Sequence, residues 1–122
     1  MRTLALDQAS RITGWAVFDD GELYNYGKFT ATQTDVGDRL HFIRKEVLGL
    51  IDKFDIEEVV FEDIQLQNNV VNNVATFKAL AEVFGVLHEL FVDLKMPRTA
   101  VLSTAWKSSL GIKGKDRTAQ KK

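Results

Sequence analysis

The chain has 122 residues, of which 45% are hydrophobic and 27% charged, with no cysteine and a net charge of −1 at pH 7. These values predict one small soluble domain with a real core, and they exclude disulfide bonds and thiolate metal sites. No apolar run approaches the roughly 20 residues of a membrane span, and no secretory signal precedes the first apolar segment, so we expect a cytoplasmic protein.

The charge is divided unevenly along the chain. Residues 95–122 hold eight basic residues and one acid, Asp116, which makes this end about +7 and leaves −8 for residues 1–94. Such asymmetry predicts a polyanionic partner for the C-terminal end. A solvated, frayed terminus would give the same pattern.

The first three predicted elements are strands, over residues 2–7, 12–19 and 22–29. A small polar turn separates the first two. Asp19-Asp20-Gly21 joins the second to the third, and its Asp-Gly pair is a strong hairpin signal. We therefore expect the chain to begin with three antiparallel strands.

A helix and a fourth strand follow. Thr34 or Asp35 can cap the helix, in which apolar residues recur at steps of three and four (Val36, Leu40, Ile43, Val47, Leu50, Ile51 and Phe54). The fourth strand covers residues 57–62. Because a helical crossover joins parallel strands, this strand is expected to lie parallel to the first.

A long helix is predicted over about residues 73–95, after an amide-rich loop at 65–73. Its polar stripe is narrow (Lys78, Glu82, Glu89 and Asp93), and nearly all its other residues are apolar. One sheet needs only about a third of the helix circumference, so we expect this helix to pack also against its own copy in a homodimer. Burial under a further part of the same chain would explain the pattern equally.

The C-terminal part contributes a fifth strand and a short helix. Pro97 ends the long helix, and residues 98–102 form the strand. Ser103 can cap a helix that runs to about Leu110 and contains Trp106, a core anchor or a base-stacking residue. Residues 113–122 contain hardly any apolar side chains.

Two carboxylates stand at strand ends. Asp7 ends the first strand and Glu62 the fourth, and a carboxylate there costs several kcal/mol unless it is compensated, usually by a cation. The divalent cations that assist phosphodiester hydrolysis are bound by carboxylate oxygens. Asp63 must point to the opposite face. In the alternative interpretations, Asp7 bonds the Ser10 amide in a turn, and Glu62 pairs with Arg11.

The element order and several motifs resemble one family. Leu6-Asp7-Gln8-Ala9-Ser10-Arg11-Ile12-Thr13-Gly14-Trp15 resembles the opening of RuvC-type Holliday junction resolvases, which carry Gly in place of Ala9; Val60-Phe61-Glu62, Trp106-Lys107 and Leu110-Gly111-Ile112 follow in the family's order. The resemblance implies an α/β, ribonuclease H-like fold over a single domain, residues 1–122. Its five-stranded mixed sheet would have the first three strands antiparallel and helices flanking it.

The resemblance also implies a function, that of a crossover junction endodeoxyribonuclease. Enzymes of this family are homodimers that bind four-way junctions and cut two strands symmetrically, with Mg²⁺ or Mn²⁺ held by four acidic or near-acidic ligands. Asp7 and Glu62 match the first two ligands and are the implied catalytic residues. Lys107 and Arg117 match basic positions near the DNA, and the remaining candidate DNA contacts lie beside them or in the first turn (Lys113, Lys115, Ser10 and Arg11).

The chain departs from the family pattern in two places. The family's remaining ligands come from a final helix, whereas this chain stops at Lys122, so it resembles a truncated or partly ordered resolvase that is catalytically incomplete. The family's junction-stacking aromatic is replaced by Gln65 or Leu66. The short length and the lack of cysteine resemble the phage-borne branch, which acts in the cytoplasm of a bacterial host cell.

Two other functions fit parts of the sequence. A non-catalytic dimer that binds branched DNA would keep the fold and two residual acids. A fragment of an actin-like or sugar-kinase-type ATPase would begin with a similar hairpin, but that superfamily normally needs two lobes, and no Gly-rich adenosine loop is visible here.

Overall fold

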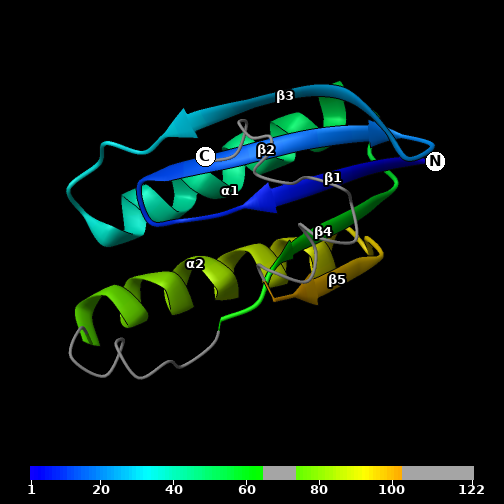
Figure 1. The fold of residues 1–122 in the computed structure, drawn as a ribbon. Helices are drawn as coiled ribbons and strands as arrows, with labels where there is room; N and C mark the ends of the chain where they lie inside the picture. Colours follow the sequence, from blue (N-terminus) through cyan, green and yellow to red (C-terminus); the bar gives the residue numbers. More distant parts are fainter. Residues whose placement is uncertain (65–73, 103–122) are drawn as a thin grey trace, which may run out of the picture.

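The centre of the molecule is a five-stranded mixed sheet with the order β3-β2-β1-β4-β5 (Figure 1). The computed structural model describes residues 1–64 and 74–102. Its elements are β1 (Arg2–Asp7), β2 (Ile12–Asp19), β3 (Glu22–Thr30), α1 (Val36–Lys53), β4 (Glu58–Glu62), α2 (Val74–Asp93) and β5 (Arg98–Val101). The first three strands are antiparallel, β4 runs parallel to β1, and β5 runs parallel to β4. The predicted fold class and the parallel return of β4 are confirmed.

Local signals explain where the elements begin and end. The hairpin between β2 and β3 turns through Asp20 and Gly21, whose φ values of 52° and 85° favour short polar residues and glycine. Asp35, and not Thr34, caps α1, because its Oδ2 accepts the Asp38 amide at 2.9 Å. The long helix ends at Asp93, earlier than expected, since Lys95 takes a left-handed conformation with φ of 55° before Pro97 is reached.

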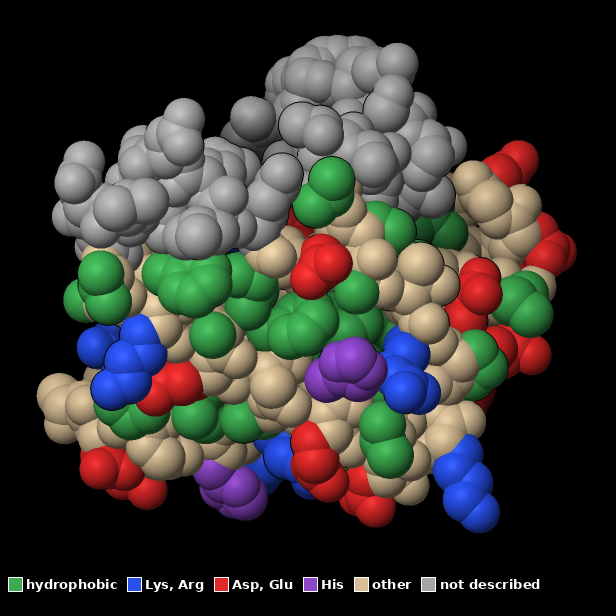
Figure 2. Space-filling model, turned by 90° about the horizontal axis from the view of Figure 1, so that it is seen from below, with side chains coloured by type: hydrophobic (Ala, Val, Ile, Leu, Met, Phe, Trp, Pro, Cys, Tyr) green, Lys and Arg blue, Asp and Glu red, His purple; other side chains and the backbone are tan. Residues whose placement is uncertain are grey.

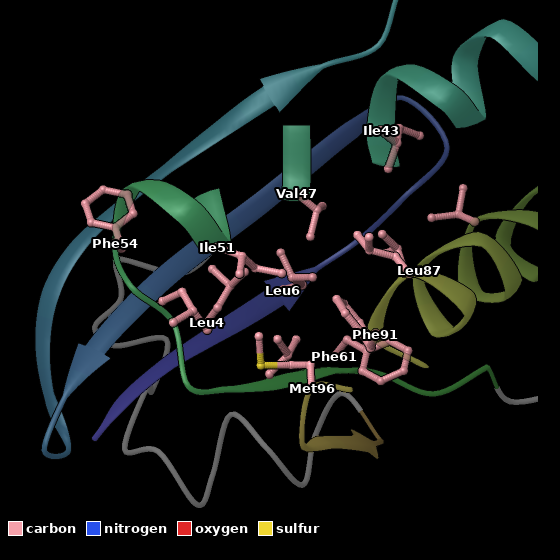
Figure 3. Packing of buried hydrophobic residues seen from close by; sticks show 14 of the residues in the cluster. Leu4, Leu6, Ile43, Val47, Ile51, Phe54, Phe61, Leu87, Phe91 and Met96 are labelled. Atoms are coloured by element: carbon pink, nitrogen blue, oxygen red, sulfur yellow. The ribbon is translucent and has the colours of Figure 1, made fainter. Parts of the chain in front are cut away.

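The two helices cover one face of the sheet. In Figure 3 the side chains of Leu4 and Leu6 of β1 point toward Val47 and Ile51 of α1, and Phe61 of β4 lies with them in the same buried cluster. Phe61 also packs against α2, because its ring centroid lies 5.1 Å from that of Phe91. This helix-covered face therefore holds the main hydrophobic core.

The other face of the sheet, which we call the second face, has a much smaller apolar cluster. Ala5 of β1 and Phe18 of β2 are buried there, and half-buried apolar side chains of β2, β4 and β5 pack around them (Ala16, Val60 and Val101). Side chains alternate between the faces of a strand, so Leu4 and Leu6 belong to one face and Ala5 to the other. The next residue of β1 on the second face is Asp7.

Several predicted features lie outside the described residues. They are the amide-rich loop at 65–73, the helix that begins at Ser103 with Trp106, and the basic segment 113–122. Within residues 1–64 and 74–102, no helix combines the length and the apolar character needed to cross a bilayer.

Candidate active site at the carboxyl ends of β1 and β4

The register of the sheet places Asp7 and Glu62 next to each other. β1 and β4 are paired in parallel up to Leu6 opposite Phe61, and the two acids are the next residue of each strand. Ala5 and Val60, two residues earlier, both belong to the second-face cluster. Because side chains alternate, Asp7 and Glu62 occupy neighbouring positions on that same face.

The surroundings of Asp7 leave its carboxylate accessible. Asp7 is exposed, and within the described part of the chain its carboxylate takes part in no hydrogen bond or ion pair, so the Ser10 turn interaction does not form. On β2 its partner is Gly14, where a Cβ atom would stand 3.8 Å from the Asp7 Cβ. The glycine thus keeps side chains out of the space beside the acid.

An exposed lysine completes this row of residues. Lys28 of β3 is the register partner of Gly14, as Gly14 is of Asp7, so the three positions share the second face. The row Lys28, Gly14, Asp7 and Glu62 therefore has a cation at one end, two acids at the other and no side chain at Gly14. The sequence reasoning missed Lys28, because its place in the row depends on the pairing of β2 with β3.

Gln8 is a second residue that the sequence reasoning missed. Its side chain is buried, with 7% exposed, and its amide is hydrogen-bonded twice to the main chain of Glu62. Nε2 donates to the Glu62 carbonyl at 2.6 Å, and Oε1 accepts the Glu62 amide at 3.1 Å. A polar residue directly after a strand-end acid was the available signal, but its partner lies 54 positions further along the chain.

The first turn holds the candidate DNA contacts Ser10 and Arg11. Ser10 is half-buried, and Arg11 is exposed. The Arg11 guanidinium donates to the Gln33 carbonyl at 2.8 Å and to the Ala31 carbonyl at 3.4 Å, and within residues 1–64 and 74–102 it forms no ion pair with Glu62. The buried Arg39 of α1 also donates to the Gln33 carbonyl, at 3.3 Å. Arg11 therefore helps to attach the segment before α1 to the turn beside Asp7.

The remaining titratable candidates are Asp63 and the two histidines. Asp63 follows β4, and its Oδ1 accepts the Ile64 amide at 2.8 Å. His41 is exposed on α1. His88 of α2 packs edge-on against Phe61, with ring centroids 5.8 Å apart, and so lies on the helix-covered face. Neither histidine shares the second face with Asp7.

The donor set at the strand ends fits a hard divalent cation. Within residues 1–64 and 74–102, no group of three or more His, Cys, Asp or Glu side chains gathers in a metal-binding arrangement. Mg²⁺ is commonly held by one or two carboxylates together with water and substrate phosphate, and Asp7 with Glu62 match that number and type. The basic candidates of the C-terminal segment lie outside the described residues (Lys107, Lys113, Lys115 and Arg117).

Solved structures of RuvC share this ribonuclease H-like fold. The structure of Thermus thermophilus RuvC in complex with a Holliday junction substrate has a TM-score of 0.74 and 14% sequence identity, over 89% of this chain and 69% of that chain. A second Thermus thermophilus RuvC structure has a TM-score of 0.64 and 17% identity, over 82% and 63%. The chain thus spans about two thirds of the length of these proteins. No family model matches the sequence, and no curated protein is similar enough in sequence to be a match.

Proposed function

We propose that the chain is a structure-selective endonuclease that cleaves Holliday junctions and other branched DNA by metal-dependent hydrolysis. The observation that carries the proposal is the neighbouring placement of Asp7 and Glu62 on the second face, at the carboxyl ends of two parallel strands. The structural similarity to RuvC supports the choice of substrate, because one of the similar structures contains a Holliday junction.

In this proposal Asp7 and Glu62 hold Mg²⁺ or Mn²⁺. The ion, when bound, neutralises charge on the phosphodiester and activates water. The open position at Gly14 gives the DNA backbone room beside Asp7, and Lys28 stands on the far side of that gap. A lysine at this point can pair with a phosphate next to the one that is cut.

The basic C-terminal segment is the proposed second contact with DNA. Its charge of about +7 over residues 95–122 suits a polyphosphate partner, as a protein that binds DNA gains affinity by neutralising phosphates. We assign backbone contacts to Lys107, Lys113, Lys115 and Arg117, with Ser10 and Arg11 of the first turn beside the acid pair.

A second copy of the chain is the proposed partner of α2. Two residues of its polar stripe contact α1, where Arg44 donates to Asp93 at 3.0 Å and to Glu89 at 3.4 Å. Val74 and Val92, 71% and 53% exposed, are 18 residues apart, which is five helical turns and hence one side of the helix.

Further apolar residues widen this side of α2 on the flank away from the polar stripe. Phe77 and Ala81 are half-buried there, and they are bordered by the half-buried Phe84 and His88, whose rings also pack against Phe61. Hydrophobic side chains gather on the face seen in Figure 2, with acidic and basic side chains around them. In a two-fold dimer the same flank of both copies meets, so its apolar side chains would be buried against each other.

The oligomeric state tests this part of the proposal. Val92→Lys should convert a dimer into a monomer in sedimentation equilibrium, because it places a charge within the interface. The matched change Lys45→Glu, at an exposed position of α1, should leave the dimer intact. A monomeric wild-type protein, or a dimeric Val92→Lys variant, would contradict the assignment.

Cleavage of labelled DNA tests the function itself. We expect the complete-length protein to nick a four-way junction in Mg²⁺, to be inactive in EDTA, and to leave linear duplex uncut. Asp7→Asn should keep junction binding and lose nicking, because an amide is a poor ligand for a hard cation. Undiminished cutting by Asp7→Asn would refute the role of this acid.

A non-catalytic junction-binding dimer is the second candidate. It is favoured by the finding that no group of three or more His, Cys, Asp or Glu side chains within residues 1–64 and 74–102 could hold a metal ion. The same experiment separates the two candidates. Junction binding without cleavage by the wild-type protein, in both Mg²⁺ and Mn²⁺, would select the binding protein.

A further inference from the structure

At the carboxyl end of β1, a side chain continues the pairing of two strands. Alternate residues of β4 turn their peptide groups to opposite neighbours. Val59 and Asp63 turn toward β5, because their amides donate to the carbonyls of Pro97 and Val101 at 2.9 and 2.8 Å. Glu62 is the residue directly before Asp63, so its N–H and C=O point the opposite way, toward β1.

The main chain of β1 does not extend the ladder to Glu62. Backbone pairing ends at Leu6 opposite Phe61, and the carboxamide of Gln8 takes over at the next step. Like a peptide group, it offers one donor and one acceptor, and it uses both on Glu62, at 2.6 and 3.1 Å. Gln8 is 7% exposed, so water has little access to replace these bonds.

We propose that Gln8 is a positioning residue for the acid pair, which it serves by holding the main chain of Glu62 at a set distance from Asp7. Gln8 follows Asp7 directly in the chain and is hydrogen-bonded to both peptide groups of Glu62. The link therefore runs from the residue that follows Asp7 to the main chain of Glu62, and it involves neither carboxylate. The inference rests on the proposed function, since the pair matters as a site for a divalent cation.

The chemistry of the side chain at position 8 is restrictive. Methionine has a similar length but neither the N–H donor nor the carbonyl acceptor. An ionised glutamate can accept the Glu62 amide but cannot donate to the Glu62 carbonyl. Asparagine has the amide but is one methylene shorter. Only glutamine combines this length with a neutral donor and acceptor.

The experiment compares Gln8→Met with Thr3→Val. Thr3 makes the matched contact at the other end of the same strand pair, where its hydroxyl donates to Glu58 Oε2 at 2.7 Å. We would measure Mn²⁺ binding to the DNA-free protein by calorimetry, junction binding in EDTA, and hydrogen exchange of the Glu62 amide. A merely structural role would not single out Mn²⁺ binding from junction binding.

Gln8→Met should weaken Mn²⁺ binding 10- to 100-fold, as is typical when a group that orients a metal ligand is removed. It should also speed exchange of the Glu62 amide and leave junction binding in EDTA within twofold. Thr3→Val should keep Mn²⁺ binding within twofold. Wild-type Mn²⁺ affinity in Gln8→Met, or an equal loss in Thr3→Val, overturns the inference.

Two further measurements keep the result unambiguous. If Gln8→Met does not fold, Gln8→Asn takes its place: we expect at least a tenfold loss of Mn²⁺ affinity, and unchanged affinity overturns the inference. A wild-type protein that neither binds Mn²⁺ nor cuts junctions would refute the proposed function. In that case the hydrogen bonds of Gln8 to Glu62 are tested by hydrogen exchange alone, and equal exchange rates of the Glu62 amide in wild type and variant overturn the inference.

Discussion

At the amino end of the β1–β4 ladder, the acids are bound to neighbouring groups of the protein. Glu57 Oε1 accepts the Arg2 amide at 2.8 Å, and Glu58 Oε2 accepts the Thr3 hydroxyl at 2.7 Å. Arg2 also donates through Nη1 to the Phe54 carbonyl at 2.9 Å. These carboxylates complete the local structure where β1 and β4 begin.

At the carboxyl end of the same ladder, the hydrogen bonds go to the main chain instead. Gln8 bonds the peptide groups of Glu62, and the Asp7 carboxylate is exposed, with no bonded partner in residues 1–64 and 74–102. Both ends thus carry acids beside the same two strands. At the amino end the carboxylates of Glu57 and Glu58 accept hydrogen bonds from β1, whereas at the carboxyl end the Asp7 carboxylate is left exposed.

The largest difference in cleavage rate is expected between two single variants, one at Glu62 at the carboxyl end of the ladder and one at Glu58 at its amino end. We expect Glu62→Gln to reduce Mg²⁺-dependent junction cleavage about 10³-fold, because the loss of a metal ligand removes several kcal/mol of transition-state stabilisation. Glu58→Gln should stay within about twofold, since an amide oxygen can still accept the Thr3 hydroxyl. Single-turnover cleavage rates measure both; equal losses would show that the two ends do not differ in function.

A smaller effect is expected from the cation in the site row. Lys28→Ala should weaken junction binding and lower the log–log salt slope by about one unit, the value for one lost phosphate contact. Lys45→Ala, at an exposed position on α1, serves as the control and should leave the slope unchanged. Lys107→Ala and Arg117→Ala should each act as Lys28→Ala does. Titrations at several salt concentrations decide, and an unchanged slope in Lys28→Ala would remove it from the DNA interface.

The smallest effect concerns a third acid near the amino end, Asp20. Its carboxylate accepts a hydrogen bond from the Met1 amino group, which raises the pKa of that amine and lowers the pKa of Asp20. The raised amine pKa stabilises the fold below the ordinary pKa of the amine, and this contribution is lost as the pH rises through the folded value. Asp20→Asn should return the amine pKa toward its ordinary value in an NMR titration, with junction cleavage unchanged. A raised amine pKa in the variant would exclude the carboxylate as its cause.

Much of the fold could be predicted because its signals are local. The bounds of β1 and β2 follow from short apolar runs, and the turn at Asp20 and Gly21 follows from residues that tolerate positive φ. The apolar period of α1 and its Asp35 cap come from neighbouring residues as well. The parallel return of β4 followed from the crossover that a helix imposes.

The contacts of the candidate site could be predicted only in part. Strand-end positions singled out Asp7 and Glu62, but nothing near Gln8 in the chain indicates that its amide bonds a residue 54 positions away. Lys28 could not be predicted for the same reason, since its position beside Gly14 depends on how β3 aligns with β2. The contacts of Arg44 with the polar stripe of α2 span 45 and 49 positions.

The sequence by itself determined the elements, their order and the two acids, because periodicity, caps and turns act over a few residues and one apolar face leaves few ways to stack them. Only the tertiary structure decided which side chains meet. Register between distant strands is set by the joint packing of Leu4, Leu6 and Phe61 under both helices, and a shift of one residue would move every side chain to the other face. The same packing puts Asp7 and Glu62 on one face and places Gln8 between their strands.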